Sequence, residues 1–229
     1  MASRSPKVLN IRLAILDAAH QHFSHFGFAK VTMSEIARDV GMGKASLYYY
    51  FPAKEDLFKA VVLREQEDFA VQIRILLGKK EISASEKLAR YIEYRFEYSN
   101  KLMNLNIPDL YSSEKMRPLL KDLFQSFAKN ELLYFERIIR EGRQQGEFLD
   151  IPSVERMAKT FLHVLQGLRM RIYRNRTGPQ VEPERIEELR NDMKAVTTIF
   201  IRSMTREPEG HTLVSTPHRT IHQYSTKRS

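Results

Sequence analysis

The chain has 229 residues, of which 42% are hydrophobic and 28% charged, and its formal net charge is +9. A chain of this length can bury one substantial core, or a small head and a larger body. The absence of cysteine excludes disulfides, thiol redox sensing and cysteine-ligated metal sites. No apolar run is long enough to span a bilayer, and the first ten residues lack the apolar segment of a secretion signal, so we expect a cytoplasmic protein without membrane contact.

The positive charge suits a polyanionic partner such as DNA. Many acidic residues are interleaved with the basic ones, however, so a general basic coat explains the charge equally well. Composition alone therefore favours nucleic-acid binding only weakly.

Residues near position 32 carry the signals of a short, capped helix. Thr32 and Glu35 have capping-box spacing, in which each side chain bonds the backbone amide of the other residue. Ile36 and Ala37 are predicted to face inward, as expected for an amphipathic helix. Gly41 ends this helix, because glycine adopts the left-handed conformation without steric cost.

A second short helix is predicted only a few residues later. Its Leu47 and Phe51 lie one turn apart and are expected to pack on the first helix. Three consecutive tyrosines, Tyr48 to Tyr50, are hard to explain as core residues. Two short helices at this spacing predict a helix-turn-helix.

The second helix has the residues expected of a helix that enters the major groove of DNA. Such helices read bases with residues near their N-terminus and contact phosphates with residues around them. The alternative is that the unit serves only packing, or that the tyrosines form a protein interface. The residues predicted to contact DNA are Thr32, Met33, Gly43, Lys44, Ala45, Ser46, Tyr48, Tyr49, Tyr50 and Lys54.

The run from Ile11 through Phe58 resembles the N-terminal domain of the TetR family of transcriptional regulators. The resemblance rests on many positions in strict order, among them residues 15–19, 27–28, 31–33, 35–37, 40–41, 47–51 and 54–57. Weaker similarity to the family's regulatory domain lies at residues 141–142, 145–148 and 166–168. One departure is Gly43, where the family more often has serine or threonine. A glycine can still cap the helix, but it removes a hydroxyl that would contact phosphate.

The remainder of the chain is predicted to be helical, without a convincing period-2 strand. The fold class is therefore all-α, with an N-terminal three-helix helix-turn-helix head and a C-terminal helical regulatory and dimerisation bundle. We expect a DNA-binding domain at residues 8–58, a ligand-binding and dimerisation domain at 59–205, and a disordered tail at 206–229. The helices expected in the body cover about Lys54 to Leu77, Ser83 to Leu102, Leu119 to Arg143, Asp150 to Tyr173 and Pro183 to Met204. A polar turn is expected at residues 174–179, between the last two.

Two of these helices are predicted to form a dimer interface. The helix that ends near Tyr173 is apolar over more than one face, so one side would pack on its own domain and the other on a second subunit. With the last helix it can build a four-helix interface about a two-fold axis, as the resemblance also implies. The alternative is a central helix in a monomeric bundle. The predicted interface residues are Phe161, Leu165, Leu168, Ile172, Leu189, Met193, Val196 and Phe200.

A second set of residues indicates a ligand cavity in the body. These are aromatic, flexible or cationic side chains that could surround a cavity between helices. A buried arginine such as Arg95 would need an anionic or carbonyl partner. Aromatic residues at helical spacing are more often simply core, and arginine often extends to solvent. The candidate ligand-binding residues are Phe69, Ile73, Tyr94, Arg95, Tyr98, Met103, Phe124, Phe127, Tyr134 and Phe161.

Other chemistry finds no support in the sequence. His22 and His25 share a helix face, but no carboxylate completes a metal site there, and we find no catalytic motif. We therefore expect neither an enzyme, a metal nor a cofactor. The prediction is a homodimeric transcriptional regulator that binds a palindromic double-stranded DNA operator and leaves it when a small-molecule effector binds, hence a repressor. The alternative function is a helical protein-interaction or scaffold module that does not read DNA.

Overall fold

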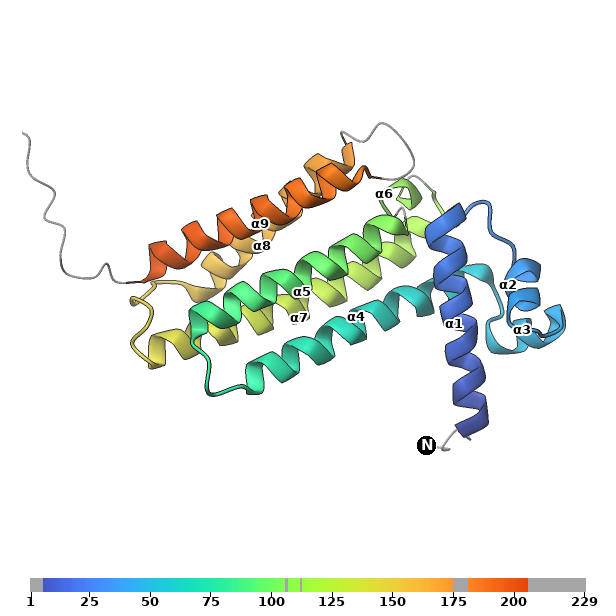
Figure 1. The fold of residues 1–229 in the computed structure, drawn as a ribbon, viewed down its shortest axis with the longest axis horizontal. Coiled ribbons are helices and arrows are strands. Elements are labelled where there is room, and N and C mark those ends of the chain that lie inside the picture. Colours follow the sequence, from blue (N-terminus) through green and yellow to red (C-terminus); the bar gives the residue numbers. More distant parts are fainter. Residues whose placement is uncertain (1–5, 106, 112, 175–180, 206–229) are drawn as a thin grey trace, which may run out of the picture.

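The computed structural model describes residues 6–105, 107–111, 113–174 and 181–205. In these ranges the named elements are all helices, arranged as a small head, an elongated body and one long helix that joins them (Figure 1). The all-α prediction is confirmed. The helices are α1 (Pro6–Phe26), α2 (Met33–Asp39), α3 (Lys44–Tyr50), α4 (Lys54–Gly78), α5 (Ala84–Asn104), α6 (Ile107–Leu110), α7 (Met116–Gln144), α8 (Val154–Arg174) and α9 (Pro183–Met204).

The head consists of α1, α2 and α3 packed on the first turns of α4. The capping box at α2 is confirmed, since the Thr32 hydroxyl accepts from the Glu35 amide and the Glu35 carboxylate accepts from the Thr32 amide at 2.8 Å. Gly41 has a φ of +70°, the left-handed conformation predicted for it. The head core is fully buried and includes Phe23, Leu47 and Phe58.

Helix α4 belongs to both parts of the molecule. Its first turns bury Leu57 and Phe58 in the head, and its later turns bury Phe69 and Ile73 in the body (Figure 1). The expected boundary between residues 58 and 59 therefore falls inside an unbroken helix of 25 residues. A tilt of this helix in the body moves the head with it.

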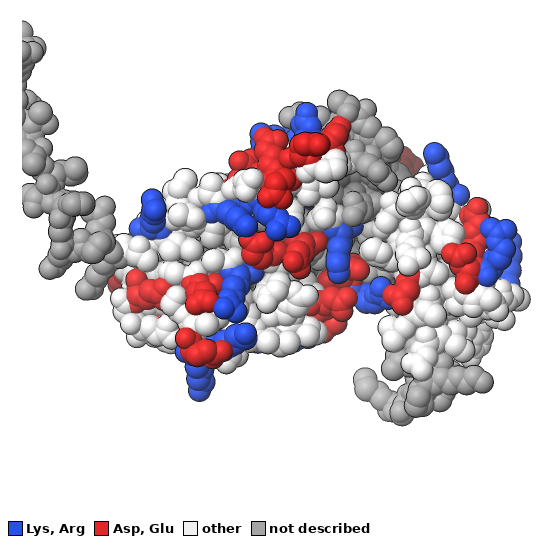
Figure 2. All heavy atoms as spheres, viewed as in Figure 1, with Lys and Arg blue, Asp and Glu red and all other residues white. Residues whose placement is uncertain are grey.

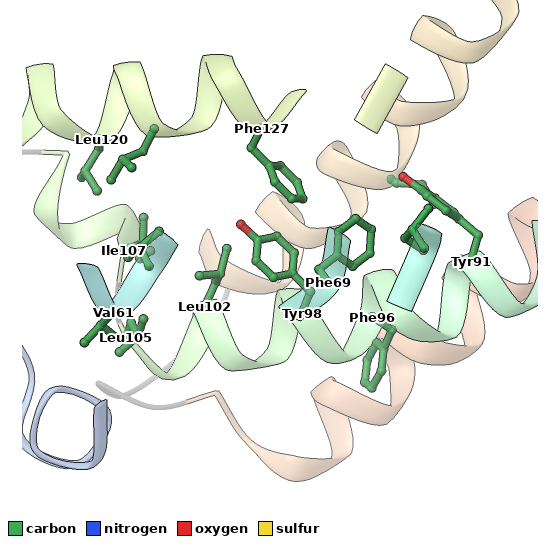
Figure 3. Packing of buried hydrophobic residues seen from close by; sticks show 14 of the residues in the cluster. Val61, Phe69, Tyr91, Phe96, Tyr98, Leu102, Leu105, Ile107, Leu120 and Phe127 are labelled. Atoms are coloured by element: carbon green, nitrogen blue, oxygen red, sulfur yellow. The ribbon is translucent and has the colours of Figure 1, made fainter. Parts of the chain in front are cut away.

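The body is a layered bundle in which α5 and α7 lie between α4 on one side and α8 and α9 on the other (Figure 1). Aromatic rings fill its interior. Phe161 lies between Phe135 and Phe200, with ring centroids 4.8 Å and 4.4 Å away. A second cluster consists of Phe69, Tyr98 and Phe127, whose rings point toward one another (Figure 3).

The start of α5 is capped both by a nearby serine and by a residue distant in sequence. The amide of Glu86 donates to the Ser83 hydroxyl at 3.1 Å, but the Glu86 carboxylate pairs with Arg90. The carboxylate of Glu147, from the turn after α7, instead accepts from the amides of Ala84 and Ser85 at 2.7 and 2.9 Å. The helix N-terminus is thus capped by a residue distant in sequence.

The predicted helix boundaries agree closely with the structure for the last helix, α9. Helix α7 begins three residues earlier than predicted, at Met116, and α8 begins later, at Val154. The predicted turn at 174–179 and tail at 206–229 lie outside the described residues, except for Arg174, which ends α8. Among the described helices, none is both long and apolar enough to cross a membrane.

Candidate DNA-recognition surface and effector cavity

Helices α2 and α3 form the predicted helix-turn-helix. The amide of Met42 donates to the Ala37 carbonyl at 2.9 Å, which closes the turn after α2. Leu47 is fully buried in the head core, so the opposite face of α3 points to solvent. This anchoring explains why a helix of only seven residues can present its side chains rigidly.

The outward face of α3 carries most of the predicted DNA contacts. Lys44, Ala45 and Ser46 are exposed in its first turn. Tyr48 is exposed, and Tyr49 is 85% exposed, an extreme value for an aromatic side chain. Tyr50 is partly buried and packs edge-on against Tyr49. A row of exposed tyrosines beside small residues and a lysine suits a surface that contacts phosphates and bases.

Two of the predicted contacts lie before α2, and the structure separates them. Thr32 is exposed at the N-cap of α2. Met33 is buried in the head core at 5% exposure, so its side chain is not available to DNA. The prediction for the Met33 side chain is therefore wrong. The pattern that suggested it is a helix start, which fixes the backbone but does not decide which side chain turns inward.

Lys54 has a role inside the head. Its ammonium group donates to the carbonyls of Phe28 and Val31 at 2.8 and 2.9 Å and lies 4.4 Å from the centre of the Phe28 ring. Burial lowers the pKa of Lys54. These bonds tie the first turn of α4 to the loop before α2. Its ammonium group also donates to the Ala29 carbonyl at 3.5 Å, so a phosphate contact by Lys54 would need another rotamer.

Gly43 occupies the N-cap of α3, with a φ of −70° and no side-chain cap. A Cβ added there would meet only the Ser46 hydroxyl, at 3.9 Å. The position therefore has room for a serine or threonine side chain.

We expect Gly43→Ser to tighten binding to the operator by about 2- to 10-fold, because the new hydroxyl can donate one hydrogen bond to a solvent-exposed phosphate. Fluorescence anisotropy with a labelled operator measures this, and the unfolding midpoint of the variant serves as control. Weaker binding by a normally folded Gly43→Ser protein would contradict this placement of α3 on DNA.

The body holds a cavity of about 470 Å³, a size typical of small-molecule sites. It lies among α5, α6, α7 and α8. Four predicted ligand residues line it: Arg95, Tyr98, Phe124 and Phe127. The rest of its lining is Leu102, Ile107, Tyr111, Ala128, Glu131, Gln166, Arg169, Met170 and Arg174.

One wall of the cavity is a buried polar cluster. The Arg95 guanidinium forms an ion pair with Glu131, and its Nη1 donates to the Ser99 hydroxyl at 2.6 Å. The Tyr91 hydroxyl donates to the same Glu131 carboxylate at 2.7 Å. The prediction that a buried Arg95 needs an anionic partner is confirmed, and the partner is a residue of this chain.

Five other predicted ligand residues do not line the cavity. Phe69 packs against the rings of Tyr98 and Phe127, and Ile73 is fully buried core. Tyr94 is packed on the core, Phe161 lies in its aromatic cluster, and Tyr134 lines a smaller surface hollow. The prediction that these five residues line the cavity is therefore wrong. Helical spacing shows which side chains are buried, but it does not show where a cavity lies between the helices. The side chain of Met103 is outside the described part.

Glu131 and Arg169 line the cavity but are not among the ligand-binding residues predicted from the sequence. Each carried a readable signal. Glu131 is four residues from both Phe127 and Phe135, and Arg169 is four residues after Leu165, so both lie on apolar faces of their helices. A charged residue within an apolar stripe indicates either a buried ion pair or a ligand contact.

The outer faces of α8 and α9 differ from the predicted interface. Phe161, Leu165, Ile172, Leu189 and Met193 are all buried inside the single subunit. Leu168, Val196 and Phe200 are partly buried and packed on the same core. The prediction that these side chains face a second subunit is therefore wrong for the five buried ones. The residues exposed on the outward side of these helices include Val164, Gly167, Ala195 and Ile199.

Head and body meet at a buried carboxylate. Glu65 of α4 is 4% exposed and lies 3.5 Å from Nε2 of His20 in α1 and 2.8 Å from Nζ of Lys101 in α5. His22 pairs with Asp39 at 2.7 Å inside the head. Two of the clustered histidines thus have carboxylate partners within the fold. No group of three or more histidines and carboxylates suited to a metal occurs among the described residues.

The charged side chains are mixed in sign over the visible face of the body (Figure 2). Many of them form ion pairs, such as Arg190 and Lys194 of α9 with Glu93 of α5. No broad field of one sign covers this face. The body surface in this view therefore gives no sign of a separate polyanion site.

Two family models match the chain. Residues 15–61 match "Bacterial regulatory proteins, tetR family", and residues 77–206, more than half of the chain, match "QacR-like protein, C-terminal region". A transcriptional regulator from Cytophaga hutchinsonii has a similar crystal structure, with a TM-score of 0.76 and 34% identity over 84% of this chain and 97% of that chain.

Two further similar proteins come from other bacteria. The fatty acid metabolism regulator protein of Bacillus subtilis is 26% identical over 69% of this chain and 80% of its own length. SmeT is the repressor of the Stenotrophomonas maltophilia multidrug efflux pump SmeDEF. Its complex with triclosan has a TM-score of 0.67 and 19% identity, and covers 93% of this chain and 100% of that chain. At that identity the likeness concerns the fold.

The helix-turn-helix head, the helical body with its cavity and these matches agree with the resemblance that the sequence suggested. The chain belongs to the TetR family of transcriptional regulators, and it is a DNA-binding regulator with a helical C-terminal ligand-binding domain.

Proposed function

We propose that this protein is a dimeric repressor that binds a palindromic operator through α3 of each subunit and leaves it when a small-molecule effector enters the cavity. The observation that carries the proposal is the cavity of about 470 Å³ in a body that shares α4 with the DNA-binding head. SmeT, a repressor with the same fold and a triclosan complex, supports a repressor with a small-molecule effector.

The proposed DNA contacts follow from the exposed face of α3. Ala45 and Ser46 are small and lie in its first turn, so they approach base edges. Lys44, Tyr48 and Tyr49 reach the phosphates on either side. The Lys44 ammonium lies 6.0 Å from the centre of the Tyr48 ring, so the two can act together at the same strand.

A short chain of contacts leads from the cavity to the first turn of α4. Ile107 and Tyr111 line the cavity, and Nε of Arg117 donates to the Tyr111 carbonyl at 3.1 Å. Lys115, just before α7, pairs with Glu55 in the first turn of α4 at 2.7 Å, and this hydrogen bond lowers the pKa of Glu55. An effector that moves the α6 segment therefore acts on the helix that carries the head.

The size of the response follows from linkage. Effector and DNA must each prefer one of two conformations, and typical coupling between such sites is about 1 to 3 kcal/mol. The effector should then lower operator affinity by about 5- to 150-fold, and DNA should weaken effector binding by the same factor.

Selection from a random DNA library tests the proposal. The purified full-length chain should enrich a two-fold symmetric sequence, and its affinity should fall steeply with salt because phosphate contacts release counterions. A compound screen on that sequence should then find an effector that releases the protein. No enriched sequence would favour a helical interaction module instead, and compounds that bind without changing DNA affinity would contradict the switch.

Glu65→Gln is expected to weaken the coupling between effector and DNA. The substitution removes the charge that His20 and Lys101 share across head and body, while the DNA surface stays unchanged. We expect operator affinity without effector to change less than about threefold and the effector response to shrink by about fivefold or more. Glu67→Gln is the matched control, because Glu67 is exposed on the same helix and pairs only locally with Arg74. Equal responses of both variants and the wild type would contradict a coupling role for Glu65.

A further inference from the structure

The cavity contains more positive than negative side chains. Arg95, Arg169 and Arg174 line it, together with a single carboxylate, Glu131. Glu131 is already used twice, by the ion pair with Arg95 and by the hydrogen bond from Tyr91. The Arg95 charge is therefore compensated within the fold. Burial and the Arg95 guanidinium lower the pKa of Arg169 by more than Glu131 raises it.

Arg169 is the most unusual of these cations. Its side chain is only partly exposed, on the cavity side of α8. In the part of the chain that the structure describes, burial and the charges of neighbouring groups act on its guanidinium, and no hydrogen bond is among them. Most arginines of the body that are this far from solvent have a carboxylate beside them, as Arg95 does.

The surroundings disfavour the charge on Arg169. Burial, and then the neighbouring Arg95 guanidinium, lower the pKa of Arg169 to about 10. The side chain remains protonated near neutral pH, but its charged form is less stable than in water. A bound anion would supply the counter-charge and relieve both effects.

Apolar side chains form a large part of the cavity lining. They are Leu102, Ile107, Phe124, Phe127 and Met170, and Figure 3 shows Leu102 and Phe127 beside Tyr98. Burial raises the pKa of Tyr98, so its hydroxyl stays protonated and can donate a hydrogen bond. A ligand that fits has an apolar portion of moderate size and one anionic end.

We infer that the cavity binds an amphipathic organic anion, whose carboxylate pairs with Arg169 and whose apolar portion lies against Phe124, Phe127 and Met170. Binding of such an anion does not depend on the proposed function. Only the statement that the anion is the effector rests on the proposed function. A cationic ligand is disfavoured. It would be repelled by Arg169 and Arg174, and the only carboxylate in the lining of this cavity, Glu131, is already paired with Arg95.

Three probes with the same alkyl chain test the inference by calorimetry on the full chain: dodecanoate, dodecan-1-ol and dodecyltrimethylammonium. They differ in charge at one end only. We expect dodecanoate to bind at least about 10-fold more tightly than the alcohol, as a charge-assisted hydrogen bond implies. The cation should bind most weakly of the three.

Arg169→Gln should weaken dodecanoate binding by about 10- to 150-fold and leave the alcohol nearly unaffected. The matched control is Arg156→Gln, an exposed position on the same helix that lines no described cavity, which should change neither. Circular dichroism checks that both variants fold. We expect the unfolding temperature of Arg169→Gln to stay at or above the wild-type value, since the substitution removes a cation whose charged form burial disfavours.

The inference is overturned if wild-type protein binds the alcohol or the cation as tightly as dodecanoate, if none of the three binds, or if Arg169→Gln binds dodecanoate like the wild type. The DNA selection separates this failure from failure of the proposed function. If the protein selects an operator and only neutral or cationic compounds release it from that operator, the proposed repressor function is supported and the anion-binding inference is rejected. If dodecanoate binds tightly and this binding depends on Arg169, but no DNA sequence is selected, the anion-binding inference is supported and the proposed repressor function is rejected.

Discussion

Ile199→Asp is expected to convert the protein to a monomer in sedimentation at micromolar concentration and to weaken binding to a two-half-site operator by about 100- to 10,000-fold. The large loss arises because a dimer binds its second half-site intramolecularly, at high effective concentration, and a monomer does not. Binding to a single half-site should stay nearly unchanged.

The choice of Ile199 follows from the outward faces of α8 and α9. Ile199 is 69% exposed, the highest value for an aliphatic side chain among the exposed large hydrophobic residues. Val164 on α8 is also exposed, and a Cβ added to Gly167 would meet no atom within 4 Å. These helices lie on the side of the body away from α4 (Figure 1), so a partner here would leave the head free for DNA. A carboxylate at the centre of such an apolar interface would be desolvated without a partner.

Leu133→Asp provides the matched control. Leu133 of α7 is 62% exposed, but it lies beside Leu77 and Gly78 at the end of α4. A new charge there should change neither sedimentation nor operator affinity. If both variants remain dimers, or if Leu133→Asp is the one that dissociates, the interface lies elsewhere.

The head could be predicted from sequence because its signals are local. The capping box at Thr32 and Glu35 and the left-handed Gly41 each act within a few residues, and the structure shows them as predicted. Burial of Leu47 followed from spacing alone, and it decides which face of α3 is free. The prediction for Met33 was wrong because the direction of its side chain depends on how α2 packs on the rest of the head.

The body could be predicted as helices but not as a site. Apolar spacing identified Phe161 and Leu165 as buried, yet it could not show whether their own subunit or a second one buries them. The hydrophobic effect is non-directional, so the same apolar helix face can be buried within its own subunit or against a second one. The cavity depends on where four helices fail to fill the space between them. The strongest indication of it was a charge within an apolar stripe, as at Glu131 and Arg169.

Glu131→Gln is expected to lower the free energy of unfolding by about 3 to 5 kcal/mol, the usual cost of leaving one partner of a buried ion pair without the other. Glu131 is 4% exposed and Arg95 7%, so the substitution leaves the guanidinium without its counter-charge in a place shielded from bulk solvent. Glutamine keeps the shape and an oxygen that can accept from Tyr91. The measured loss therefore reports on the charge.

A double variant, Glu131→Gln with Arg95→Met, decides whether the pair or the individual residues matter. Methionine fills most of the space of the arginine stem and carries no charge, so the double variant should recover most of the stability that Glu131→Gln loses. Urea unfolding measures all forms, with equal slopes as the sign of comparable unfolding. If the double variant is less stable than Glu131→Gln, the cluster is held by Arg95 through Ser99 and packing, and the ion pair is not its main support. The double variant also removes the repulsion between Arg95 and Arg169 across the cavity.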